Sequence, residues 1–180
     1  MQDYDYSSGG AYFITICTKN RENYFGEIAD GAMVLNEWGK IVFDGIKNIE
    51  NYNEFSSVDE FVVMPNHLHL IIMVSYRRDN SGIVSTEQNV GIVSTTTMKT
   101  AENRNNRRNM LIPKIVGKFK MITAKQINIL KNSVGNKLWQ SNYYDRIIRN
   151  EDELQRIRKY IIENPLKWEF DKNNTENLFM

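Results

Sequence analysis

The two histidines of the 180-residue chain, His67 and His69, are separated by a single residue. On a β-strand, residues i and i+2 project from the same face, so this pair could hold one metal ion. A closed structural zinc site would need more histidine or cysteine ligands, and Cys17 is the single cysteine. Oxygen ligands would have to complete the shell, which points to Mg²⁺ or Mn²⁺. A purely structural histidine pair is the alternative.

A second candidate pair lies further along the chain, where Tyr160 and Asn164 are four residues apart. Residues at this spacing share one face of a helix. A tyrosine hydroxyl has a pKa of about 10 and needs activation before it can act as a nucleophile. The alternative is that the Tyr160 ring packs at the edge of the core.

Charge is distributed unevenly along a chain whose formal net charge is only +1. Residues 21–60 carry nine acidic and three basic side chains, whereas residues 99–125 carry eight basic side chains and one acidic one. A basic face of this kind attracts phosphate backbones, although a solvated helix face is the alternative. The candidate DNA-binding residues are Lys114, Lys118, Lys120, Lys125, Arg146 and Arg149. Alternatively, Arg146 pairs only with Asp145 or Glu151.

Several classes of protein are excluded by composition. No run of about 18 apolar residues is present, so we expect neither a transmembrane helix nor a membrane partner. Residues 1–10 lack the basic-then-apolar order of a signal peptide. The single cysteine fits a reducing compartment, and we expect a cytoplasmic protein with one domain over residues 1–180.

The order of the predicted elements indicates a fold class. Apolar periodicity predicts strands at 11–18, 57–64, 67–75 and 138–148, and helices at 33–52, 111–131 and 151–164. Asn150 and Glu153 form a capping-box signature at the start of the last helix. The resulting β-α-β-β-α-β order predicts an α+β, ferredoxin-like antiparallel sheet with helices on one face. The additional C-terminal helix carries Tyr160.

Two ranges have no clear periodicity. Residues 20–31 are polar and glycine-containing, which predicts a loop or an irregular hairpin. Residues 77–109 are rich in Ser, Thr, Asn and Arg and contain GIVST twice. Their length and composition predict a flexible insertion loop.

Taken together, the motifs resemble those of a known family. The stretches are YFITICT, FVVMPNHLHLII, KIVGKFK and LWQSNYYDRIIRNEDELQRIRKYIIENPLKW, which span Ala11 to Trp168. In this order they resemble the single-tyrosine HUH transposases, which comprise the REP-associated tyrosine transposases and short insertion-sequence transposases. Residues 77–109 depart from the resemblance, because they are longer and lower in complexity than the usual link.

The resemblance implies a chemistry and assigns residues to it. Tyr160 matches the nucleophile, His67 and His69 match the ligands of a divalent metal, and Asn164 matches a third ligand. The implied reaction is cleavage and rejoining of single-stranded DNA beside hairpins, through a 5′-phosphotyrosine link and a free 3′-hydroxyl. The implied partner is single-stranded or hairpin DNA. Some relatives are homodimers, so an active site across a subunit boundary is open.

Three other functions remain open. They are a replication initiator or relaxase of the same chemistry, a host-retained HUH nickase, and a non-catalytic ferredoxin-like nucleic-acid-binding module. The last would need aromatic residues exposed on its sheet. Tyr143 and Tyr144 point to opposite faces of a strand, so one could stack on a base.

Asn66 either shapes the turn before His67 or supports the metal ligands without binding the metal itself. We expect Tyr160 to meet both histidines in one cleft.

Overall fold

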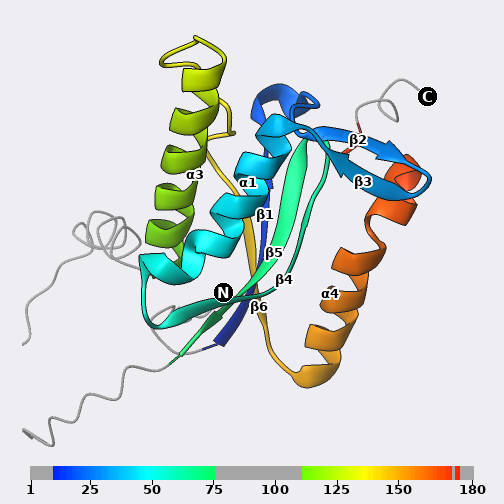
Figure 1. Cartoon of the computed structure of the whole chain (residues 1–180). Coiled ribbons are helices and arrows are strands. Elements are labelled where there is room, and N and C mark those ends of the chain that lie inside the picture. The colour runs from blue at the N-terminus through cyan, green and yellow to red at the C-terminus, as the bar shows by residue number, and fades with distance from the viewer. Residues whose placement is uncertain (1–9, 76–110, 172, 175–180) are drawn as a thin grey trace, which may run out of the picture.

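A computed structural model describes residues 10–75, 111–171, 173 and 174. The predicted insertion loop at 77–109 lies outside the described residues. The described elements follow the predicted β-α-β-β-α-β order, with a hairpin added after the first strand and a helix added at the end (Figure 1). Among these elements, no helix combines the length and the apolar character needed to cross a membrane.

A four-stranded antiparallel sheet lies at the centre of the fold (Figure 1). Its spatial order is β4 (Ser56–Val63), β5 (His67–Val74), β1 (Gly10–Cys17) and β6 (Tyr144–Ile148). All three strand pairs are antiparallel. This order is the ferredoxin-like arrangement, so the predicted fold class is confirmed. It leaves β4 and β6 as the edge strands.

The helices cover both faces of the sheet. Helices α1 (Glu37–Lys47) and α3 (Leu111–Leu130) pack on one face, and α4 (Glu151–Glu163) packs on the other (Figure 1). Because side chains alternate along a strand, β5 contributes to both layers. Its residues Leu68, Leu70 and Ile72 join the core under α1 and α3, while Ile71 joins the core under α4. His67 and His69 share the Ile71 side, so they face the α4 layer.

The predicted helix at 33–52 is wrong at its start. Strands β2 (Gly26–Ala29) and β3 (Ala32–Leu35) form a hairpin there, and α1 begins at Glu37. Both residues of the connecting turn, Asp30 and Gly31, have positive φ, as the twist of a tight hairpin requires. The Asn36 side chain accepts a hydrogen bond from the Gly39 amide and fixes the helix start. A short 3₁₀ helix, η2 (Asn48–Tyr52), completes the range.

The predicted strand at 138–148 is too long, since β6 covers only Tyr144–Ile148. The earlier part of the range anchors to the core instead. Trp139 is buried, forms a single bridge with Thr18 and donates its indole N–H to Thr123 Oγ1 at 3.1 Å. This anchoring explains the apolar pattern that resembled a strand. The intervening residues are therefore a loop at the edge of the sheet.

Helix α4 begins as predicted, with Asn150 accepting a hydrogen bond from the Glu153 amide at 2.9 Å. Its buried Leu154 and Ile161 pack on the sheet. The helix ends at Glu163, and a 3₁₀ helix, η3 (Pro165–Phe170), follows directly. This turn brings the chain back towards β5.

Candidate active site

The two histidines and Tyr160 converge on one point. His67 and His69 are buried on β5, and their Nε2 atoms are 3.1 Å apart. The hydroxyl of Tyr160, on α4, lies 3.2 Å from His69 Nε2. The expected meeting of these groups is therefore found, and it occurs within one chain. Because α4 packs on the sheet, Tyr160 lies over β5, the strand that carries both imidazoles.

The opposite nitrogens of both imidazoles have partners that orient the rings. His67 Nδ1 lies 2.9 Å from Asn66 Oδ1, and His69 Nδ1 lies 2.8 Å from Thr15 Oγ1. Asn66 Nδ2 donates to two backbone carbonyls, so its Oδ1 can only accept. His67 Nδ1 must therefore carry the proton, which leaves a lone pair on Nε2. A neutral imidazole held in this way is ready to bind a metal.

Oxygen atoms complete a donor set around the histidines. Asp171 follows η3, and one ligand atom from each of His67, His69 and Asp171 lies within 4.8 Å of the others. Asn164 is buried beside them, with its Nδ2 donating to Asp171 Oδ2 at 3.3 Å. Its Oδ1 is buried without a hydrogen-bond partner. Such an oxygen is costly to bury, and a bound cation would satisfy it.

This set of two imidazole nitrogens, a carboxylate and an amide oxygen fits a divalent metal ion. The unpartnered Oδ1 of Asn164, whose Nδ2 contacts Asp171, is an additional oxygen that a bound cation would satisfy. Sequence reasoning missed Asp171 and Thr15. Strand pairing opposite His69 could have pointed to Thr15, but Asp171 lies beyond the Asn-Pro motif with no periodic signal.

Aromatic rings enclose Tyr160 and the histidines. Phe13 stacks on His69 with centroids 5.3 Å apart and meets Tyr160 edge-on at 6.1 Å. Trp168 stacks on His67 at 6.0 Å. Burial raises the pKa of Tyr160, the charge of Asp171 raises it further, and a hydrogen bond from Asn164 opposes them. The hydroxyl thus stays protonated at neutral pH and must be activated to act as a nucleophile.

A cleft of about 550 Å³ opens beside Tyr160 and His69. Most of its side chains come from β1, β5, β6, α4 and the loop before β6. The wall formed by β6 and the loop before it is polar and aromatic. It includes Gln140, Asn142, Tyr143, Tyr144 and Arg146. Tyr160 lines this cleft and is 38% exposed, so a substrate in the cleft can contact its side chain.

The candidate lysines of α3 lie away from this cleft. Lys114, Lys118 and Lys125 are exposed on the helix layer opposite the histidines. Lys118 sits over the ring of Tyr52, 4.7 Å from its centroid. None of the three lines the cleft, so DNA that touched both would have to pass around a sheet edge.

Lys120 has a different environment from its neighbours. Its ammonium donates to three successive carbonyls, those of Gln140 at 2.7 Å and of Ser141 and Asn142 at 3.2 Å each. Burial lowers the pKa of this lysine. The ammonium thus holds the loop that forms one wall of the cleft.

The two candidate arginines differ in their position relative to the cleft. Arg146 lines the cleft and forms an ion pair with Glu153, which is neither of the two partners, Asp145 and Glu151, that the alternative to DNA binding named. Its side chain is still 59% exposed. Arg149 is exposed outside the cleft, and its backbone amide donates to Glu153 Oε2 at 2.9 Å. Glu153 therefore fixes the junction between β6 and α4.

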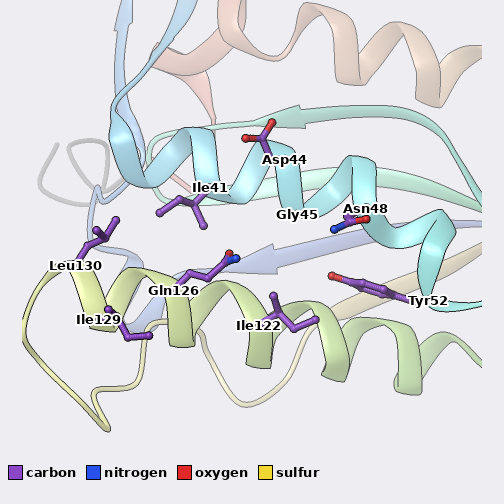
Figure 2. Close-up of a pocket in the computed structure, with 9 residues that line it drawn as sticks. All are labelled: Ile41, Asp44, Gly45, Asn48, Tyr52, Ile122, Gln126, Ile129 and Leu130. Atoms are coloured by element: carbon purple, nitrogen blue, oxygen red, sulfur yellow. The ribbon is translucent and has the colours of Figure 1, made fainter.

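A second cavity of about 410 Å³ lies between α1 and α3 (Figure 2). Isoleucines and Leu130 line much of it, and its residues include no histidine, cysteine or basic side chain. It is on the sheet face opposite the two histidines. We assign the chemistry to the cleft at Tyr160 for these reasons.

Comparisons with known proteins give two useful matches. An uncharacterized protein of Haemophilus influenzae is 36% identical over 172 residues, which cover 96% of this chain and 89% of that protein. A solved REP-associated tyrosine transposase bound to a REP hairpin matches 96% of this chain and 77% of its own, with a TM-score of 0.51 and 18% identity. At that identity the likeness concerns the fold. No protein-family model matches.

A further solved structure comes from Deinococcus radiodurans R1. It matches 92% of this chain and 97% of its own, with 19% identity and a TM-score of 0.46. That score is too low to support a conclusion about either protein.

Proposed function

For a chain that belongs to the family of the Haemophilus influenzae protein and has the fold of a REP-associated tyrosine transposase, we propose a metal-dependent transposase activity on single-stranded DNA. The resemblance to single-tyrosine HUH transposases, predicted from the sequence motifs, is confirmed for the fold. The observation that carries the proposal is the Tyr160 hydroxyl, 3.2 Å from His69 Nε2 beside a second imidazole. The buried Asn164 Oδ1, which has no hydrogen-bond partner, supports metal binding over a purely structural histidine pair.

In the proposed reaction the Tyr160 oxygen attacks a backbone phosphorus of the DNA. The new bond is Tyr160 O–P, the bond that breaks is P–O3′, and the leaving 3′ oxygen gains a proton as the phenol loses one. The products are a 5′-phosphotyrosine and a free 3′-hydroxyl. Because the phosphodiester energy is kept in the covalent link, attack by a 3′-hydroxyl rejoins the strand without ATP.

The protein's contribution to this reaction is mainly positional. His67, His69, Asn164 and the newly found Asp171 would hold Mg²⁺ or Mn²⁺, which when bound supplies electrophilic assistance at the phosphate. Asn164 follows Tyr160 by one helical turn, so nucleophile and ligand have a fixed spacing. Two rigid elements, β5 and α4, thereby preset the geometry of attack.

The proposed site needs only one chain. Tyr160 reaches the histidines of its own β5, so a homodimer, which the resemblance also allowed, is not required to bring them together. Arg158 supports this arrangement, because its guanidinium pairs with both Asp59 carboxylate oxygens at 2.8 Å and ties α4 to β4. We therefore propose an active site that is complete within one chain.

The proposed partner is single-stranded DNA next to a hairpin. The solved REP-associated transposase is bound to a REP hairpin, which supports this choice of ligand. We propose that Arg146 contacts phosphate in the cleft, and that Lys114, Lys118, Lys125 and Arg149 attract the DNA backbone from outside it. A cytoplasmic location is part of the same proposal.

A covalent-adduct assay tests this function. The protein is incubated with hairpin DNA from the ends of its own genomic locus and with Mg²⁺ or Mn²⁺, and the mixture is run on a denaturing gel. We expect a metal-dependent DNA–protein band from the wild type that disappears in Tyr160→Phe. Tyr52→Phe is the control, since Tyr52 lies in the opposite layer, and it should keep the band.

Two outcomes would contradict the proposal. A band that persists in Tyr160→Phe would assign the nucleophile to another residue. DNA binding without any covalent band, with competent DNA and metal present, would favour the non-catalytic nucleic-acid-binding module.

A further inference from the structure

Tyr144 occupies one row of the sheet with the proposed metal ligands. It pairs directly with Thr15 of β1, and Thr15 pairs directly with His69 of β5. Side chains of directly paired residues project from the same face of a sheet. Tyr144 therefore faces the same side as His69, two strands away, and it lines the cleft beside Tyr160.

Its immediate neighbour has a different environment. Tyr143 packs against the core under α1 and α3, and the Lys120 ammonium lies 5.8 Å from its ring centroid. Tyr144 is 56% exposed. The sequence left open which of the two tyrosines would be available to a ligand. Both line the cleft, and Tyr144 is the more exposed of the two, so its ring is the one favoured for contact with a ligand.

The surroundings of Tyr144 suit an unpaired nucleotide. Arg146 is two residues further along β6 and projects from the same face into the cleft. Gln140 and Asn142 line the cleft too, and their amides can both donate to and accept from a base edge. Lys120 holds the backbone of this loop through three carbonyls, so the wall is ordered before a ligand arrives.

The position of β6 gives access to this surface. It is an edge strand, so a DNA strand can reach Tyr144 from the open side of the sheet. We propose that the exposed Tyr144 ring is a stacking platform for one unpaired base of the DNA strand next to the scissile phosphate. This inference rests on the proposed function, because it takes single-stranded DNA as the ligand. Aromatic rings bind single strands in this way with little dependence on base identity.

The test measures binding without cleavage. The parent protein carries Tyr160→Phe, and its ligand is the hairpin oligonucleotide with its single-stranded flank, without added metal. Tyr144→Leu removes the aromatic ring but keeps apolar bulk, and Tyr144→Phe keeps the ring. We expect Tyr144→Leu to weaken binding roughly 5- to 100-fold and Tyr144→Phe to change it by less than about twofold.

A series of abasic oligonucleotides identifies the stacked base. One base at a time is removed from the flank, and each oligonucleotide is measured with the parent and with Tyr144→Leu. When the stacked base is the one removed, Tyr144→Leu should weaken binding by about twofold or less, because the Tyr144 ring of the parent then has no base to contact. The control Lys125→Met, on the far layer, should weaken intact and abasic ligands equally.

Four results decide the matter. Equal binding by parent and Tyr144→Leu would overturn the stacking inference. The same penalty with every abasic oligonucleotide would overturn it as well, since it would show a structural effect of the substitution. If the parent does not bind the oligonucleotide at all, the inference fails together with DNA as the ligand. A position-specific coupling without any adduct from the wild type would contradict only the proposed cleavage.

Discussion

The side-chain amide of Asn66 donates to the backbone carbonyl of Asn173 at 2.8 Å, which joins the turn before the histidine strand to the segment after η3. The same side chain accepts from His67 Nδ1. One buried residue therefore orients a proposed metal ligand and fixes the segment that brings Asp171 into the site. The turn between β4 and β5 therefore contributes a side chain to the site as well as reversing the chain.

Replacing Asn66 should affect both stability and metal binding. Asn66→Ala removes the hydrogen bonds to the Arg21 and Asn173 carbonyls and to His67 Nδ1, which we expect to lower the free energy of unfolding by about 1–3 kcal/mol. Loss of the partner behind His67 should also weaken Mn²⁺ binding about 10- to 100-fold. Urea denaturation and calorimetric titration with Mn²⁺ measure the two effects.

Thr15→Val separates those two effects, because it removes only the partner of His69 Nδ1. We expect weaker Mn²⁺ binding from this variant too, without loss of the link to Asn173. Unchanged Mn²⁺ affinity in both variants would show that these residues do not support metal ligands.

Asp171 should contribute to metal affinity. Asp171→Asn keeps the size of the side chain but removes the negative charge from the donor set, so we expect Mn²⁺ to bind at least about tenfold more weakly. Calorimetric titration of the purified variant gives this affinity independently of any reaction. Glu169→Gln is the control, because Glu169 lies on η3 but is not part of the donor set. Equal affinities in wild type and Asp171→Asn would exclude Asp171 as a ligand.

Lys120 and Lys125 lie on the same helix but should act differently on DNA binding. Lys125→Met should reduce the slope of log affinity against log salt by up to about 0.7, the value for one phosphate contact on a single strand. Lys120→Met should leave the slope unchanged, because its ammonium is directed at three loop carbonyls. Fluorescence anisotropy over a series of salt concentrations measures both slopes. A reduced slope in Lys120→Met would support the direct phosphate contact that the sequence predicted.

Glu153 should make stability depend on pH. The Arg149 backbone amide holds the pKa of the Glu153 carboxyl below its usual range, and the charges of Arg146 and Arg156 act in the same direction. Because the folded-state pKa is the lower one, this stabilisation is present above the unfolded-state pKa of about 4.3 and is lost as pH falls through the folded-state value. Urea denaturation between pH 3 and 7 should show a smaller pH dependence for Glu153→Gln. Glu27→Gln, on the β2–β3 hairpin, should behave like the wild type.

The sequence predicted those parts of the site that depend on local spacing. The i, i+2 histidines on a strand, the i, i+4 pair of Tyr160 and Asn164, and the Asn150 cap all have short-range signatures, and the structure places them as expected. Residues whose role depends on a distant contact had no such signature. Asp171 meets the histidines only because η3 turns the chain back, and Lys120 meets three carbonyls that an amphipathic helix pattern does not reveal.

The two boundary errors have different origins. Residues 32–35 alternate with a pattern that a helix can also accommodate, and the choice was made by the hairpin turn at Asp30 and Gly31. The range 138–143 has strand-like apolar residues, but Trp139 anchors to Thr123 of α3 rather than extending the sheet. In the first case a local turn outweighed the apparent helical periodicity, and in the second a contact with a distant segment outweighed the strand-like pattern.

The distribution of the donor set along the chain has a consequence for biosynthesis. The ribosome delivers His67 and His69 well before α4, and Asp171 only after η3. A nascent chain that has exposed its histidine strand therefore holds neither the nucleophile nor the full set of oxygen donors. Under the proposed function, strand cutting would therefore have to wait until residue 171 has left the exit tunnel.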